Sequence, residues 1–139
     1  MSIIKVKSRG TDNVSGRRNI AHNGAMRVAQ RGTSQTAISS AGYYTVDRFR
    51  VATANSAGRL TMTQESITDL PGFANAIKFA CTTADTSIAA GEYLQLSQYF
   101  EGQDLQQFKK GTSSAEKVTV SFYVKGNGNA TYMLEMFDG

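Results

Sequence analysis

The chain has 139 residues, a formal net charge of +4 and 40% apolar residues, with 13 Gly and one Pro. This length and composition predict one domain with an ordinary hydrophobic core, and they exclude a disordered or collagen-like chain. No apolar run approaches the ~18 residues of a membrane span, and the N-terminus MSIIKVKSRG has neither the apolar core nor the cleavage site of a signal peptide. The single cysteine excludes an intrachain disulfide. No metal or other cofactor is expected.

The positive charge is concentrated in the first third of the chain. Residues 1–50 carry nine Lys or Arg against two Asp, which gives +7, and the rest carries six against nine acids, which gives −3. The turn-rich segment 1–18 is expected to be an extended basic arm that anchors the protein to a partner through Arg9, Arg17 and Arg18. A frayed terminus is the alternative. Nucleic acid is disfavoured as the partner, because no Lys/Arg block exceeds two residues and no aromatic residues interleave with the basic arm.

Beyond the arm, strand-like runs alternate with turn signals such as NSAG, DLPG and GNGN. The clearest alternation lies in 117–126, and Asn127-Gly128 suits a tight hairpin that pairs this run with 130–137. Only 104–112 has helical spacing, with Gly111 as its end. The runs predicted to be strands are 25–31, 43–53, 59–65, 75–82, 92–101, 117–126 and 130–137.

Short strands at this spacing predict an all-β fold, an antiparallel β-sandwich or barrel formed by residues 19–139, with at most one short helix. Cys81 is in phase with Ile77 and Phe79, so it is expected to be a small buried hydrophobe. His22 has no second His or Cys near it in the sequence, which disfavours a metal site.

Two of the predicted strands contain charges that a half-buried strand normally avoids. Alternation in 43–53 places Asp47 with Phe49 and Val51 on the packed face. A carboxylate there is costly unless a cation or hydrogen bonds satisfy it. Arg31 has the reach and the fork geometry to do so. We expect an internal polar lock in which Arg31 and Asp47 pair, Gln30 satisfies nearby backbone groups, and loss of either charge lowers stability similarly.

Catalytic motifs are absent from the sequence: it has no nucleophile elbow, no HExxH and no P-loop, and one histidine removes most triads. Glu92, Glu101 and Asp104 occur at predicted strand ends, where solvated acids are common. An enzyme is therefore not expected. Tyr43, Tyr44 and Tyr99 are candidates for stacking on a glycan, with ordinary packing as the alternative.

A series of motifs, in order over residues 17–126, resembles a β-sandwich domain of bacteriophage virion proteins of the tail-fibre type, found in marine and cyanobacterial phages. The motifs are Asn19, Asn23-Gly24, Gln30-Arg31-Gly32, Val46-Asp47-Arg48-Phe49, Pro71-Gly72-Phe73, Thr82-Thr83-Ala84-Asp85-Thr86, Gln98-Tyr99-Phe100-Glu101-Gly102 and Ser121-Phe122-Tyr123-Val124-Lys125. The chain departs from the family by lacking Trp and by ending at MLEMFDG, before the further strands that the family's sandwich usually has.

The resemblance implies a jelly roll similar to carbohydrate-binding modules and a non-enzymatic structural role in the virion. The chain would be the N-terminal part of a tail fibre, joined by its basic arm to tail or capsid proteins. The incomplete sandwich would either continue in a longer chain or be completed by a partner. Its open edges would favour pairing with other chains. The protein would therefore form homo-oligomers, and by analogy with phage fibres homotrimers. Binding of a host surface glycan is the alternative function.

Overall fold

A computed structural model describes residues 19–128 and 131–137 of the chain. The chain divides into two compact units, residues 1–104 and 105–139. The predicted arm, 1–18, lies outside the described residues. Within the described part, no helix is both long enough and apolar enough to cross a membrane.

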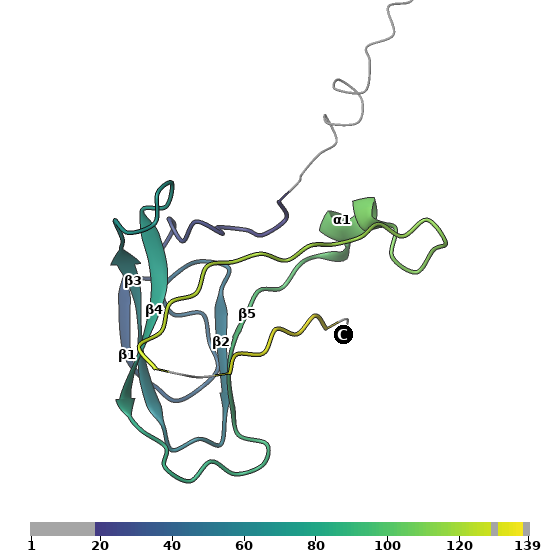
Figure 1. Ribbon diagram of the computed structural model, residues 1–139. Helices are drawn as coiled ribbons and strands as arrows, with labels where there is room; N and C mark the ends of the chain where they lie inside the picture. Colours follow the sequence, from purple (N-terminus) through teal and green to yellow (C-terminus); the bar gives the residue numbers. More distant parts are fainter. Residues whose placement is uncertain (1–18, 129–130, 138–139) are drawn as a thin grey trace, which may run out of the picture. The chain divides into compact units, whose positions relative to one another are not determined.

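The first unit contains two small antiparallel sheets (Figure 1). In the larger sheet, β3 (Arg59–Ser66) lies between β1 (Ser34–Ile38) and β4 (Asn75–Thr83), and in the smaller sheet β2 (Arg50–Ala54) pairs with β5 (Tyr93–Ser97). One short helical segment follows, α1 (Gly102–Leu105) continued by η1 (Gln106–Phe108). The predicted all-β antiparallel fold class is confirmed, whereas closure into a sandwich or jelly roll stays a prediction.

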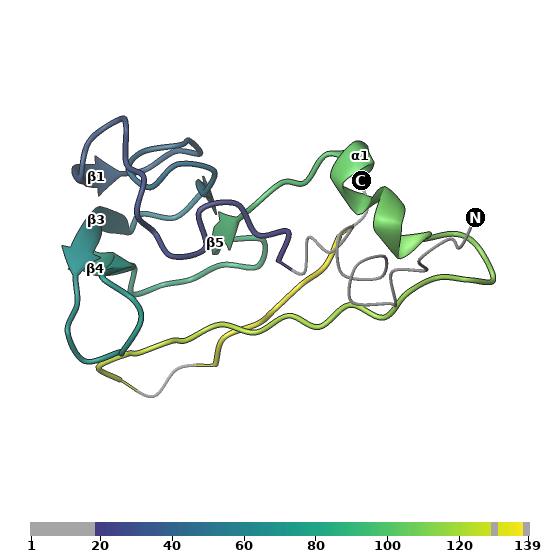
Figure 2. The same cartoon turned by 90° about the horizontal axis from the view of Figure 1, so that it is seen from above.

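Figure 2 shows the two sheets side by side, and residues of both contribute to one hydrophobic core. Its buried members come from the larger sheet (Ile38 and Met62), from the smaller sheet (Val51) and from the turn before β2 (Val46). Full burial of such a side chain contributes roughly 1.5–3 kcal/mol. The partly buried residues around this core are Met26, Tyr44, Phe49, Leu60, Ile77 and Phe79.

The strands predicted at 59–65 and 75–82 are confirmed to within one residue as β3 and β4. Those predicted at 43–53 and 92–101 are shorter, because residues 45–48 form a turn and the chain leaves the sheet after Ser97. β1 was not predicted, because its sequence SQTAI lacks an apolar alternation. In the structure the first four of its residues are exposed.

The strand predicted at 25–31 is wrong, because side chains satisfy the backbone groups that a strand would use. Asn23 Oδ1 accepts the N–H groups of Arg27 and Val28, both at 3.0 Å, and Asn23 Nδ2 donates to the Val28 carbonyl over 2.9 Å. Gln64 Nε2 on β3 donates to the Met26 carbonyl over 2.5 Å. Met26 also has a φ of 56°, outside the extended region. The segment is an irregular loop fixed by amide side chains.

A side-chain amide also holds the backbone at His22, near the start of this loop, to the end of β5. Gln98 Nε2 donates to the His22 carbonyl over 2.6 Å, and Gln98 Oε1 accepts the His22 N–H over 3.0 Å. One side-chain amide therefore replaces a pair of sheet hydrogen bonds.

The strands predicted at 117–126 and 130–137 are not formed in the described residues of either segment. Alternation determines which face a strand would bury, but a strand also needs a neighbour for its backbone hydrogen bonds. Residues 129–130, which follow the predicted Asn127-Gly128 turn, lie outside the described residues. The helical segment predicted at 104–112 ends at Phe108, since Lys109, with a φ of 50°, adopts the left-handed conformation expected for Gly111.

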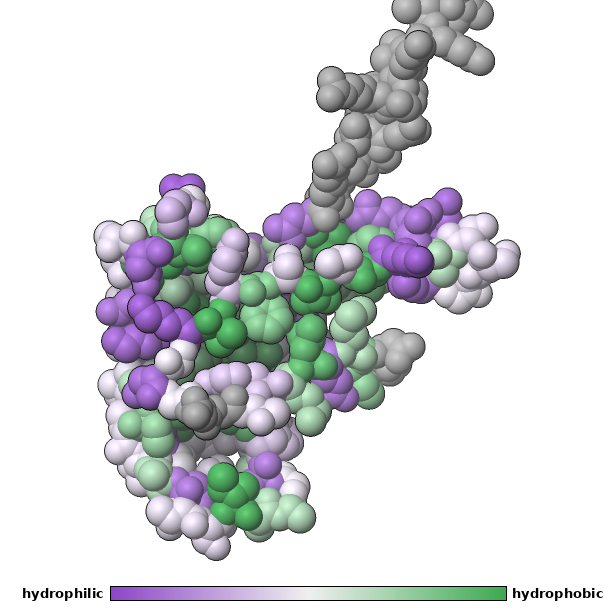
Figure 3. Space-filling model, viewed as in Figure 1, coloured by the Kyte–Doolittle hydropathy of each residue, from purple (hydrophilic) through white to green (hydrophobic). Residues whose placement is uncertain are grey.

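The edges of both sheets leave apolar side chains exposed. Cys81 on β4 is exposed and donates to the Thr83 carbonyl over 3.3 Å, so the prediction of a buried thiol is wrong. Cys81 is opposite Leu60 in the register, but β4 is an edge strand with no further strand to cover it in the described residues. On β5, Leu94 and Leu96 are 50% and 40% exposed. The space-filling view shows exposed apolar residues, in green, on one face of the molecule (Figure 3). Such open edges favour pairing with another chain.

Asp85 joins the loop before β3 to the loop after β4. Its Oδ1 accepts the Ser87 N–H over 3.1 Å, and its Oδ2 accepts the Ser56 hydroxyl and the Ala57 N–H, both at 2.9 Å. The Ser87 N–H, followed by the Ser56 hydroxyl and the Ala57 N–H, lowers the pKa of Asp85 below its ordinary value. The carboxylate is therefore ionised and accepting at neutral pH.

Thr45 is 1% exposed, and its hydroxyl is the buried side-chain polar atom that has no hydrogen-bond partner in the described residues. A buried unsatisfied polar group costs roughly 1–3 kcal/mol.

We therefore expect Thr45→Val to raise the free energy of unfolding by about 1 kcal/mol, because the methyl group removes that cost. Urea denaturation followed by circular dichroism measures the change. Thr53→Val on β2, at a half-buried position, is the control and should change little. A loss of stability in Thr45→Val would show that the hydroxyl is satisfied in solution.

Candidate functional site

Asp47 connects the loop 19–32 to the turn before β2. Arg31 Nη1 donates to Asp47 Oδ1 over 2.9 Å, and the Gln30 backbone N–H donates to Asp47 Oδ2 over 3.2 Å. The Asp47 main chain is held as well: its N–H donates to the Val28 carbonyl over 2.9 Å, and its carbonyl accepts from Asn23 Nδ2 over 3.0 Å. Four hydrogen bonds therefore fix this one residue.

The predicted Arg31–Asp47 contact is present, but it differs from the expected internal lock in two ways. The Asp47 side chain is 14% exposed, whereas that of Arg31 is 55% exposed, so the pair lies at the surface. Gln30 contributes its backbone N–H to Asp47 instead of capping backbone groups with its side chain. Alternation predicted an internal position for the pair, which is wrong because residues 45–48 form a turn and not a strand. The predicted pairing with Arg31 is correct, because a mostly buried carboxylate still needs hydrogen-bond donors.

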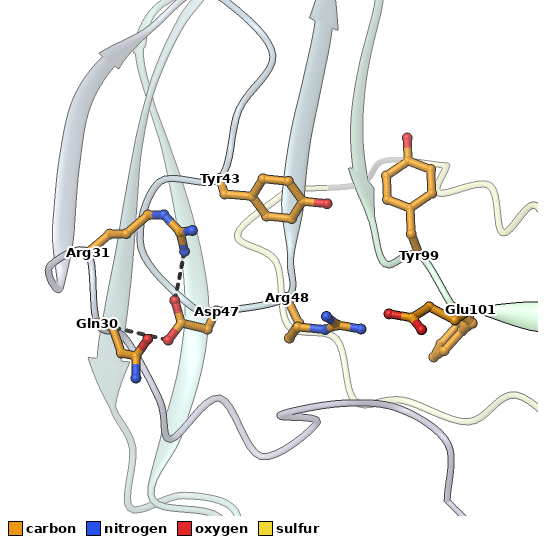
Figure 4. A pocket seen from close by; sticks show the side chains of 8 residues that line it. Gln30, Arg31, Tyr43, Asp47, Arg48, Tyr99 and Glu101 are labelled. Atoms are coloured by element: carbon orange, nitrogen blue, oxygen red, sulfur yellow. Dashed lines mark hydrogen bonds and ion pairs between the residues drawn. The ribbon is translucent and has the colours of Figure 1, made fainter. Parts of the chain in front are cut away.

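A pocket of about 410 Å³ opens beside this pair (Figure 4). Its volume falls within the ~300–1,000 Å³ typical of small-molecule sites. The lining residues come from the end of the loop 19–32, the segment 43–48 before β2 and the segment after β5; they are Gln30, Arg31, Tyr43, Asp47, Arg48, Tyr99, Phe100 and Glu101. The antiparallel register pairs Arg50 with Ser97, which brings residues before Arg50 opposite residues after Ser97.

An arginine positions each of the two tyrosines of the pocket. The Arg31 guanidinium carbon lies 5.8 Å from the centre of the Tyr43 ring, in the range of a cation–π contact. Arg50 Nη1 donates to the Tyr99 hydroxyl over 3.4 Å. Tyr43 and Tyr99 remain 42% and 58% exposed, so both offer ring surface to a ligand.

Tyr44, the third predicted stacking residue, does not line the pocket. Its hydroxyl donates to the Ser40 carbonyl over 2.7 Å and lies 3.1 Å from the Ser40 hydroxyl, and its ring packs against the core. Tyr44 is thus a packing residue, which was the alternative to glycan stacking given for all three tyrosines.

Arg48 and Glu101 extend toward one another across the pocket (Figure 4). Gln103 Nε2 donates to Glu101 Oε2 over 2.9 Å, and no ion pair joins Arg48 to Glu101 in the described residues. Arg48 has a φ of 73°, which strains a residue that bears a side chain. Arg48, Phe100 and Glu101 all belong to the sequence motifs, but the sequence predicted no site role for Arg48 or Phe100 and indicated an ordinary strand-end acid at Glu101.

The three acids considered for catalysis each have a partner in the first unit. Glu92 Oε2 accepts the Ala89 N–H over 2.9 Å, and Asp104 Oδ2 lies 3.3 Å from His22 Nε2. Glu101 accepts from Gln103, as above. In the described residues, no group of three His, Cys, Asp or Glu side chains is placed to hold a metal ion. The anchoring candidates Arg9, Arg17 and Arg18 lie outside the described residues.

No family model, no curated protein and no solved structure matches the chain. The motifs quoted above therefore carry the resemblance to phage virion domains on their own.

We expect Asp47→Ala to lower the free energy of unfolding by about 1–3 kcal/mol, because hydrogen bonds to a charged acceptor are lost. Arg31→Ala should cost less than about 1 kcal/mol, because the exposed guanidinium forms a solvent-screened pair. Thermal and urea denaturation of both variants test this asymmetry. Lys78→Ala, which removes the exposed Lys78–Glu65 pair at 3.5 Å, is the matched control. Equal losses from the two pocket variants would restore the internal lock predicted from the sequence.

Proposed function

We propose that the chain is a non-enzymatic structural domain of a bacteriophage particle, the N-terminal part of a tail fibre that attaches to tail or capsid proteins. The observation that carries this proposal is the role of the motif residues in the fold. Asn23, Asp47, Asp85 and Gln98 all belong to motifs that resemble the phage domain, and each fixes a loop through hydrogen bonds to backbone groups. Residues that determine loop conformation are suitable markers of a fold, which supports the resemblance.

Attachment occurs through the basic arm, 1–18, with Arg9, Arg17 and Arg18 facing acidic or carbonyl-rich surface on the partner. The charge distribution supports this, because nine of the fifteen Lys and Arg lie in residues 1–50. Charge complementarity of this kind contributes to specificity and association rate.

Assembly into a homo-oligomer, proposed as a trimer, follows from the open edges of the first unit. Leu96 is opposite the fully buried Val51 in the register of β5 and β2, so both share the core face, yet Leu96 remains 40% exposed. A core face that is exposed at a sheet edge favours completion by another strand.

Binding of a host surface glycan is the second candidate, because Tyr43 and Tyr99, two of the residues predicted to stack on sugars, line one pocket. Tyrosine provides rigid, amphipathic contact area with few rotatable bonds, which suits recognition of a sugar ring.

Removal of the arm tests the attachment. We expect a chain lacking residues 1–18 to remain folded, because the core residues lie between 26 and 79, but to be absent from purified particles. Replacement of Arg9, Arg17 and Arg18 by Gln should lower incorporation about tenfold or more, the effect of ~1.4 kcal/mol of lost contact energy. Lys78, Lys109 and Lys110 replaced by Gln form the charge-matched control. Immunoblots of purified particles give the readout, and wild-type incorporation of the arm variants would refute this attachment.

A glycan array tests the second candidate. Tyr43→Ala and Tyr99→Ala should each reduce retention of a bound glycan about tenfold, because stacking area is lost. Tyr93→Ala on β5, a position that is 51% exposed and outside the pocket lining, is the matched control. Hits that persist unchanged in both pocket variants would place glycan binding outside the pocket, and an array without hits would refute this candidate.

A further inference from the structure

We propose that the pocket selects a neutral sugar, whose hydroxyl groups bridge Arg48 and Glu101 while its ring contacts Tyr43 and Tyr99. This inference rests on the proposed glycan-binding function and adds the chemical class of the ligand and the residues that determine it.

The opposition of Arg48 and Glu101 supports this assignment. They face each other across the open volume (Figure 4), and no ion pair joins them in the described residues. Arg48 offers only N–H donors and an ionised Glu101 offers only acceptors. A sugar hydroxyl accepts and donates at once, so adjacent hydroxyls of one ring satisfy both sides. Gln103 already donates to Glu101 Oε2, which leaves Oε1 for the ligand and holds the carboxylate in place.

The charge of the pocket lining also supports a neutral ligand. Two positive side chains, Arg31 and Arg48, are balanced by two negative ones, Asp47 and Glu101. Arg31 is moreover bound to Asp47 over 2.9 Å and covers Tyr43, so its charge is already balanced by the Asp47 carboxylate. An acidic sugar would meet Glu101 and Asp47, and an amino sugar would meet Arg48. Like-charge contacts of this kind discriminate against both classes.

The backbone conformation of Arg48 supports a binding role for its side chain. The adjacent residue, Asp47, is fixed on both sides of its main chain, through the Val28 carbonyl and Asn23 Nδ2, and Arg48 is held at a φ of 73°. Glycine adopts this conformation without strain. The strained arginine therefore costs stability that a glycine would not, which is the pattern expected at a binding residue.

Calorimetric titration of the full chain tests the proposal. The probes are the methyl glycosides of glucose, galactose and mannose, with glucuronate and glucosamine as the charged counterparts, each up to millimolar concentration. We expect a neutral glycoside to bind with a dissociation constant that changes little between low and high salt, because no net charge is neutralised. Arg48→Gln and Glu101→Gln should each raise that constant about tenfold or more. Lys78→Gln and Glu65→Gln, an exposed pair outside the pocket lining, are the matched controls and should leave it unchanged.

Arg48→Gly separates a binding role from a structural one. It should raise the melting temperature, because glycine accepts the positive φ, while it lowers affinity as Arg48→Gln does. Preferential binding of glucuronate or glucosamine would overturn the neutral-sugar assignment but leave glycan binding intact. Neutral binding that is unaffected by the Arg48 and Glu101 variants would overturn the role of these residues. Failure of all five sugars at millimolar concentration would overturn both the inference and the glycan-binding candidate.

Discussion

The carboxylate of Asp47 requires hydrogen-bond donors because most of it is removed from solvent, and the way in which they are supplied organises the first unit. Arg31 and the Gln30 N–H bring the end of the loop 19–32 against the turn before β2. Held there, the Arg31 guanidinium lies over Tyr43 and positions its ring. Because the main chain of Asp47 is also fixed, the next residue, Arg48, follows with a left-handed backbone. The position of the loop and the lining of the pocket thus depend on one acid.

The rest of the first unit is also held by hydrogen bonds from polar side chains to backbone groups. The strands are short, the fully buried core is small, and long irregular segments need partners for their backbone groups. Amide and carboxylate side chains supply them: Asn23 within its own loop, Gln64 from β3, Gln98 after β5, and Asp85 between two loops. Loops fixed in this way can hold a binding site, even though loops in general are the mobile part of a domain.

The proposed roles use different surfaces of the chain. Ligand recognition would take place at the pocket, where turns and the segment after β5 meet. Oligomerisation would use the edges of β4 and β5, where Cys81, Leu94 and Leu96 are exposed. Attachment would use the arm. Such a separation would allow the proposed virion protein to assemble and to bind its proposed ligand at the same time.

Local pattern was sufficient for the all-β class, for β3 and β4 and for the Arg31–Asp47 pair. Alternation identifies adjacent antiparallel strands, and an acid among apolar residues implies a cation. Tertiary structure decided the rest. The polar strand β1 forms because β3 offers it backbone partners, and 25–31 does not form a strand because Asn23 and Gln64 take those groups instead. Arg48 and Glu101 face each other across the pocket because β2 pairs with β5, which is far along the chain. Long-range backbone pairing leaves no local signal in the sequence, so the pocket became visible only in the folded chain.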